Sequence, residues 1–296
     1  MNPLVRKAGA LAAALCFAQG CANEEGGDGS LVIRISGEQA ALTGYPVGSG
    51  EGEIAFADGW TFKFDKVLVS LSGFSLKTAA GADAEIESDP VVADLHEGEP
   101  ELWKFDAVPA RRWDRVSYRY EPPTTQSRKA DAVSDSDIER MRDNGYSFYI
   151  EGRAQKGDRR VDVAWGFPFK VQLSRCENGQ DGTDGLVVRE NAQNSAQVTV
   201  HLDHLFFDSW AEDEPKLRFD AMAAVAPAEG PLTLDDLARQ DNLSDLKGVD
   251  GKPLDLAYDP GSAFSPVPTN LKQYTIEGAT TTGHWNGEGH CEYVRQ

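Results

Sequence analysis

Four of the chain's five histidines fall in two short segments that also carry acidic side chains. Together the segments contain six side chains of the types that bind transition metals: His201, Asp203, His204, His284, Glu288 and His290. Imidazole and carboxylate groups in this mixture suit zinc or copper. The chain has no GxSxG nucleophile motif, and we assign no catalytic residue. The two segments are therefore a candidate metal site.

The spacing within the first segment predicts part of its geometry. If a strand runs over residues 196–202, His201 and Asp203 point to the same side, because side chains in a strand repeat every two residues. His204 then faces the other side unless the strand ends or bulges there. In the second segment, three glycines allow a tight path that can aim the histidines and Glu288 inward.

The elements that would position these residues are mainly strands. Apolar and polar residues alternate over the first two-thirds of the chain, most clearly over residues 161–173, where every second residue is apolar. One helical pattern, over residues 137–143, interrupts this alternation. After Trp210 the alternation ends, and helical patterns cover residues 216–225, 233–240 and 269–282. We expect a mainly β fold, an antiparallel β-sandwich with a small helical C-terminal subregion.

The N-terminus has the features of a bacterial export signal. A short basic stretch precedes an apolar run from Ala8 to Ala18, which is too short to span a bilayer. The following Gln19-Gly20-Cys21 resembles a lipobox, in which the cysteine is lipidated. We expect a signal peptide over residues 1–20, a flexible tether over 21–30 and one β-sandwich domain over 31–296, with a helical insertion around 212–282. The lipid on Cys21 would anchor the protein to the outer membrane, facing the periplasm or the cell surface.

Cysteine usage agrees with export. The chain has four cysteines; Cys16 lies within the signal and Cys21 is the expected lipid site. Cys176 and Cys291 are then left for the folded domain, and in an oxidising compartment they are most simply one disulfide. That bond would tie the C-terminal loop to the end of the strand expected over residues 161–173.

The net charge excludes one class of partner. With 29 Lys and Arg against 48 Asp and Glu, the formal charge is -19, so the chain repels phosphate backbones. We therefore expect no nucleic-acid binding, and the membrane is reached through the lipid anchor. The sequence does not identify a protein partner.

Calcium is not the expected ion. Residues 225–236 match the turn-forming half of an EF-hand loop, with Gly230 and Leu232 at the required positions. Val225 and Pro227 occupy two positions where oxygen ligands are needed. We interpret the segment as a turn that opens the helix expected over residues 233–240.

The order of several segments resembles a known group of proteins. Phe56-Ala-Asp58-Gly59-Trp60, the segment from His201 to Asp208 and the segment from Gly283 to Cys291 are similar to segments of largely uncharacterised lipoproteins from myxobacteria. More distantly, the strand layout is similar to periplasmic copper-binding β-sandwich proteins associated with methanobactin. The first resemblance implies the compartment and the fold, and the second implies copper as a candidate ion.

We therefore expect an exported, membrane-tethered binding or accessory protein with a transition-metal site, rather than an enzyme. Two alternatives stay open. In the first, the protein is a structural or interaction lipoprotein, and the histidines form a buried hydrogen-bond network without metal. In the second, it is a hydrolase that uses a metal-activated water.

Overall fold

The computed structural model describes residues 27–50, 52–80, 83–84, 89–256 and 258–296. The expected signal peptide, the expected lipidation site at Cys21 and residues 21–26 of the expected tether lie outside this range. Strand β1 begins at Asp28. The last three residues assigned to the tether, 28–30, therefore belong to the folded domain.

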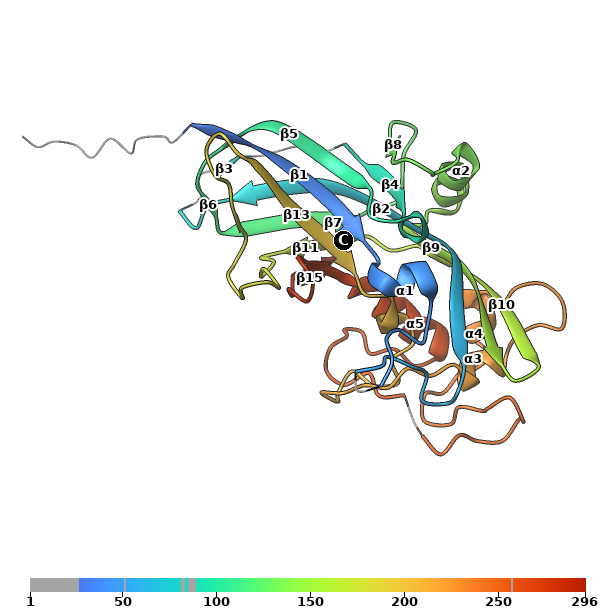
Figure 1. The fold of residues 1–296 in the computed structure, drawn as a ribbon. Helices are drawn as coiled ribbons and strands as arrows, with labels where there is room; N and C mark the ends of the chain where they lie inside the picture. Colours follow the sequence, from blue (N-terminus) through green and yellow to red (C-terminus); the bar gives the residue numbers. More distant parts are fainter. Residues whose placement is uncertain (1–26, 51, 81–82, 85–88, 257) are drawn as a thin grey trace, which may run out of the picture.

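The described residues form a mainly β protein with two large sheets (Figure 1). One sheet has four strands in the order β14 (Gly283–Trp285), β13 (Gln193–Val200), β1 (Asp28–Ser36) and β5 (Glu101–Pro109). The path of the nine-stranded sheet runs β10 (Arg159–Phe167), β9 (Phe148–Lys156), β2 (Thr61–Lys77), β7 (Arg115–Tyr120), β11 (Val171–Ser174) and β15 (Glu292–Arg295). Its remaining strands are β3 (Asp83–Ala84), β4 (Val91–Asp94) and β8 (Arg128–Lys129), and β6 (Arg112–Trp113) pairs separately with β12 (Leu186–Val187).

The inner faces of the two sheets share one core. Phe74 on β2 stacks on Trp103 of β5 and Trp285 of β14, with ring centroids 5.5 and 6.0 Å apart. The mainly β prediction is confirmed, but the sheets are mixed rather than purely antiparallel. Strand β1 pairs with β13 in parallel, because a long excursion of the chain separates them.

The segment predicted as one long strand keeps its alternation but is divided in two. All seven apolar residues from Val161 to Leu173 that alternate along it are buried. Pro168 separates β10 from β11, since proline cannot donate a ladder hydrogen bond. The two halves pair with β9 and β7 respectively, which both lie along β2. A register shift between Phe64 and Lys66 marks a bulge in β2 where it pairs with β9.

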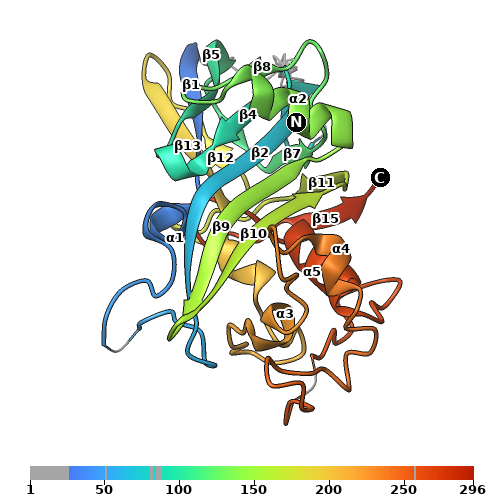
Figure 2. The ribbon, with the colours of Figure 1, turned by 90° about the vertical axis from the view of Figure 1, so that its right-hand side faces the viewer.

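Helices are few and short. They are α1 (Glu38–Thr43), α2 (Asp135–Asn144), α3 (Asp220–Ala223), α4 (Leu234–Leu237) and α5 (Leu271–Thr280), with 3-10 turns η1 (Leu95–Glu97) and η2 (Leu202–Leu205). Figure 2 shows α3, α4 and α5 together at the end of the molecule opposite α2. The helix predicted over 269–282 is confirmed as α5. The helices predicted over 216–225 and 233–240 are each only one turn long. The first begins late because Leu217 forms β-bridges, and the second ends early because the Gln240 side chain donates hydrogen bonds to backbone carbonyls of other segments.

Helix α2 begins two residues earlier than the sequence predicts. Its N-cap is Ser134, and Ser134 and Asp137 form a reciprocal capping box. The buried Asp137 carboxylate also accepts hydrogen bonds from the Lys66 ammonium at 2.7 and 2.8 Å. These contacts hold the pKa of Asp137 below its usual value against the effect of burial. The pair joins α2 to β2 at the bulge.

Asp137→Ala should therefore lower the free energy of unfolding by about 2–3 kcal/mol, because it removes a cap and leaves a partly buried ammonium unpaired. Asp135→Ala is the matched control, since the Asp135 ion pair with Lys129 is exposed and should contribute at most about 1 kcal/mol. Urea denaturation measures both. Equal losses in the two variants would contradict the role given to Asp137.

Candidate metal centre

His201 and His284 are brought together by the pairing of β13 with β14. Thr199 lies opposite His284 in this antiparallel pair. Opposite residues in such a pair, and residues two apart in one strand, project from the same face. The backbone N–H of His201 donates to the Thr282 carbonyl at 2.9 Å, which extends the pairing by one residue. The two imidazoles consequently stack, with ring centroids 4.2 Å apart.

His204 joins them because the strand ends before it. β13 stops at Val200, and η2 turns the chain so that the His204 ring lies 5.7 Å from His201 and 5.3 Å from His284. The expectation that Asp203 shares a strand face with His201 is therefore wrong. Its premise, a strand continuing through residue 202, does not hold.

Helix α5 fixes both the position and the tautomer of His204. A Cβ on Gly278 would lie 2.6 Å from the His204 carbonyl oxygen, so only glycine lets α5 approach this closely. The Thr281 hydroxyl donates to the Gly278 carbonyl and lies 2.9 Å from Nδ1 of His204. Since that hydroxyl hydrogen is already used, Thr281 accepts from Nδ1–H of His204. Nε2 of His204 is then the nitrogen with a free lone pair.

The other two imidazoles have buried nitrogen atoms without hydrogen-bond partners among the described residues. These atoms are Nε2 of His201 and Nδ1 of His284. The Glu288 carboxylate lies 3.7 Å from Nδ1 of His201 and favours a proton on that side. One nitrogen from each of His201, His204 and His284 lies within 4.8 Å of the others. We call these three residues the histidine cluster.

Burial keeps two imidazoles of the cluster, those of His204 and His284, electrically neutral. Burial, with the neighbouring His284 and His201 rings, holds the pKa of His204 well below its usual value. Burial, with the His201 and His290 rings, lowers the pKa of His284 to about 3. These two imidazoles are therefore unprotonated near pH 7, which is the form that binds metal ions.

His201 also belongs to a second group of potential ligands. Glu38, His201 and Glu288 each offer one atom, and these atoms too lie within 4.8 Å of one another. Both glutamates are exposed to solvent. The sequence analysis predicted Glu288 but missed Glu38, which lies far from either histidine segment in sequence and begins α1 with φ of 54°.

Two predicted ligands lie beside these groups but belong to neither. The His290 ring is 5.1 Å from that of His284. Asp203 lines a cavity with Glu38, His201 and Glu288, and burial raises its pKa. Thus four of the six predicted residues take part in the two groups: His201, His204, His284 and Glu288. Gly287, with φ of 90°, provides the turn expected in the second segment.

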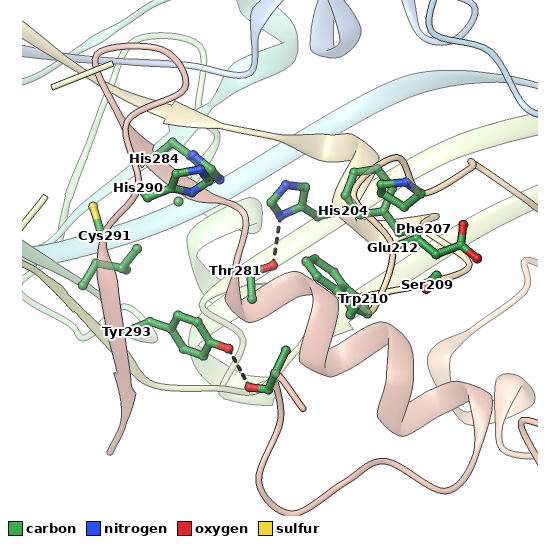
Figure 3. A pocket seen from close by; sticks show the side chains of 14 residues that line it. His204, Phe207, Ser209, Trp210, Glu212, Thr281, His284, His290, Cys291 and Tyr293 are labelled. Carbon is green, nitrogen blue, oxygen red and sulfur yellow. Dashed lines mark hydrogen bonds between the residues drawn. The ribbon is translucent and has the colours of Figure 1, made fainter. Parts of the chain in front are cut away.

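A second cavity, with a volume of about 350 Å³, also borders the cluster (Figure 3). His204 and His284 line it together with His290. Aromatic and apolar side chains form much of the remaining wall, notably Phe207, Trp210, Tyr293 and Leu173. The cluster therefore contributes side chains to two cavities, one lined by acidic residues and one mainly apolar.

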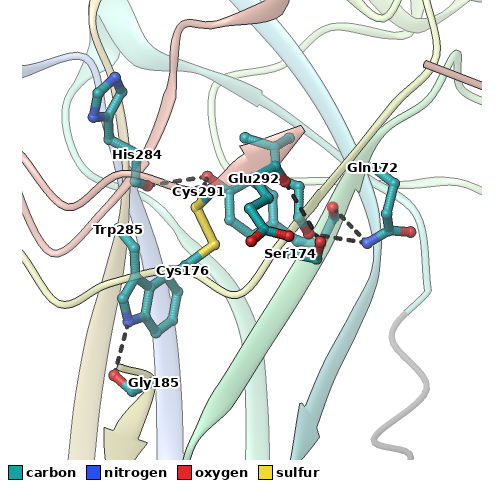
Figure 4. Close-up of a disulfide and its surroundings, with 10 residues drawn as sticks. Gln172, Ser174, Cys176, Gly185, His284, Trp285, Cys291 and Glu292 are labelled. Atoms are coloured by element: carbon teal, nitrogen blue, oxygen red, sulfur yellow. Dashed lines mark hydrogen bonds between the residues drawn. A yellow bond between two sulfur atoms is a disulfide. The ribbon is translucent and has the colours of Figure 1, made fainter. Parts of the chain in front are cut away.

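The disulfide predicted between Cys176 and Cys291 is present and anchors the segment that carries His284 (Figure 4). The two cysteines are separated by 115 residues, and closing a loop of that size contributes about 4–5 kcal/mol in the chain-entropy model. β15 follows Cys291 directly and pairs with β11, so the C-terminal loop does return to the end of the 161–173 segment. The Tyr118 hydroxyl also donates to the His284 carbonyl at 3.0 Å.

The segment that resembles an EF-hand loop forms a turn, as interpreted from the sequence. Gly230 has φ of 81°, and α4 follows directly after Thr233. The Asp236 carboxylate accepts hydrogen bonds from the backbone and hydroxyl of Thr233. The side chain that would close a calcium site is thus used to cap the helix.

No protein-family model, curated protein or solved structure matches the chain. The resemblance to the myxobacterial lipoproteins stays a prediction. None of the helices in the described residues has both the length and the apolar character needed to cross a membrane. The site must therefore be interpreted from its own geometry.

The neutral state of His284 predicts how the stability of the metal-free protein depends on pH. The unfolded chain takes up a proton on His284 near pH 6.5, whereas the folded protein does so only near pH 3. The stability contributed by the neutral form is complete above pH 6.5 and falls as the pH drops below it, by about 1.4 kcal/mol per unit. Between pH 7.5 and 5, wild type should lose about 2 kcal/mol more than His284→Gln. Urea denaturation with excess chelator measures this, and equal losses would contradict it.

Proposed function

We propose that the protein binds one divalent transition metal ion, zinc or copper(II), through His201, His204 and His284. We further propose that it does so as an exported, lipid-anchored binding protein. The observation that carries the metal proposal is the histidine cluster: three imidazoles from separate parts of the fold, with nitrogen atoms within 4.8 Å of one another.

The unpartnered nitrogens favour a metal over a structural hydrogen-bond network. Leaving a buried polar atom without a partner costs about 1–3 kcal/mol. Nε2 of His201 and Nδ1 of His284 both lack hydrogen-bond partners in the part of the chain that the structure describes, although their rings are in contact. A hydrogen-bond network would satisfy these atoms internally, and a bound ion would satisfy them by coordination.

The donor set indicates the class of ion. Three neutral imidazoles suit zinc and copper(II), whereas calcium and magnesium prefer oxygen ligands. The alternative group of Glu38, His201 and Glu288 has two solvent-exposed carboxylates, which water satisfies without a metal. We therefore assign the ion to the histidine cluster and give Glu288 the role of orienting His201.

His204→Ala and His284→Ala should each weaken zinc or copper(II) binding by more than about 100-fold, because each removes a ligand. Glu288→Gln should weaken binding by about 10–100-fold at most, since it removes only an orienting charge. Isothermal titration calorimetry of the metal-free protein at pH 7.5 measures the affinities.

His96→Ala is the matched control, since His96 bonds the Ala41 carbonyl and lies outside both groups. It should leave affinity unchanged. His290→Ala tests the rejected ligand and should change affinity far less than loss of a cluster histidine. Failure of wild type to bind zinc, copper, nickel or iron would refute the proposal. If metal affinity depends strongly on Glu38 and Glu288 and not on His284, the ion binds to the group of Glu38, His201 and Glu288 instead.

The apolar cavity makes a metal-dependent hydrolase the second candidate function. Three imidazoles leave a coordination position open for water, as catalytic zinc sites do. His204 and His284 line the cavity, so a substrate there would lie beside the ion. Hydrolysis of an activated ester that a chelator abolishes and zinc restores would support this candidate. The binding function predicts no turnover.

The lipid anchor has its own test. Cys21 follows a short apolar run and a small residue, which motivates lipidation. In the native host, Cys21→Ala should move the protein from the membrane fraction to the soluble periplasmic fraction. Fractionation followed by immunoblotting measures this. A wild-type protein that is already soluble would contradict the anchor without affecting the metal proposal.

A further inference from the structure

The apolar cavity beside the histidine cluster has aromatic walls that continue from one of the metal ligands. The His204 ring contacts Phe207 and Trp210, with ring centroids 5.0 and 5.2 Å apart. Phe207 and Trp210 also contact each other at 5.4 Å. Tyr293 and Leu173 line the cavity as well, next to the Cys176–Cys291 disulfide. A ligand in the cavity would meet both imidazole nitrogens and aromatic rings.

Hydrogen bonds and ring packing hold two of the aromatic wall residues, Tyr293 and Trp210, in place. The Tyr293 hydroxyl donates to the Ala263 carbonyl at 3.0 Å (Figure 3). The Trp210 backbone N–H donates to the Asp259 carbonyl at 2.7 Å, and its indole packs on Phe264. A cavity whose walls are already ordered loses little conformational entropy when a ligand enters.

We propose that this cavity binds a small aromatic acid, with one acidic oxygen on the metal ion and the ring between Phe207, Trp210 and Tyr293. This inference rests on the proposed function, because the ion supplies the anchor for the acidic group. The cavity volume of about 350 Å³ is at the lower end for ligand sites, which favours a molecule of one ring.

The charges around the cavity favour a single acidic group. A divalent ion held by three neutral imidazoles keeps its full charge of about two, so an anionic donor binds it better than a neutral one. Glu212 also lines the cavity and is exposed, so it repels a second negative charge on the ligand. The ligand class is therefore a monoanion with an aromatic ring.

Cobalt(II) in place of the native ion provides a spectroscopic test. The full mature chain is loaded with cobalt(II) and titrated with benzohydroxamate and with acetohydroxamate, while the visible absorption bands of cobalt are recorded. The two probes share the metal-binding group and differ only in the phenyl ring. Because the ring would bury apolar surface, benzohydroxamate should bind about tenfold more tightly, or better.

Trp210→Leu should reduce this preference to about threefold or less and leave the affinity for acetohydroxamate unchanged. Tyr146→Leu is the matched control, because Tyr146 is an aromatic residue that lines a different cavity. It should keep the full preference. Unchanged cobalt stoichiometry and far-ultraviolet circular dichroism establish that each variant is folded.

The outcomes separate the two proposals. If wild type binds no cobalt, the proposed metal function fails. If cobalt binds but the two hydroxamates bind equally, the metal function stands and the cavity inference is overturned. A phenyl preference that survives in Trp210→Leu, and equally in Phe207→Leu, would place the ring elsewhere and also overturn the inference.

Discussion

The short pairing of β13 with β14 is the contact on which the metal centre depends. It sets His284 opposite Thr199, and so on the same face as His201, although more than 80 residues separate the two histidines in sequence. Three paired residues are a weak ladder by themselves. The ladder is secured from behind by the disulfide, by the β11–β15 pairing and by the Tyr118 hydroxyl bound to the His284 carbonyl.

Orientation of the imidazoles then follows from contacts of different strength. The Thr281 hydroxyl oxygen accepts a hydrogen bond from Nδ1–H of His204, because its own hydrogen is donated to the Gly278 carbonyl. The Glu288 carboxylate lies 3.7 Å from Nδ1 of His201, beyond hydrogen-bond distance, and Nδ1 of His284 has no hydrogen-bond partner among the described residues. The ring orientation of His204, on η2, is thus fixed by its contact with α5. The ring orientations of His201 and His284, next to the strand pair, are fixed mainly by stacking and burial.

Much of the fold could be predicted from the sequence, because apolar alternation reports directly which face of a strand is buried. Residues 161–173 show this, since the alternation survives the break at Pro168. Pairing between distant strands leaves no local signal, so the parallel β1–β13 pair was missed.

The site was predicted only in part for the same reason. The two histidine segments could be recognised by residue type. Which of Asp203 and His204 joins the histidine cluster, however, depends on where β13 ends. Its end at Val200 cannot be located to one residue from the alternation of apolar residues. Glu38 had no signal at all.

The acidic composition and the imidazole donors would act differently on metal ions in the proposed site. Glu38, Asp203 and Glu288 surround the cavity on one side of His201, within a chain of formal charge -19, so they raise the local concentration of cations of every kind. This attraction does not distinguish calcium from zinc. The three imidazoles do, because nitrogen donors without charge favour zinc and copper over ions that prefer oxygen. In the proposed site, attraction and discrimination are thus assigned to different residues, and His201 is the one residue that belongs to both groups of potential ligands among the described residues.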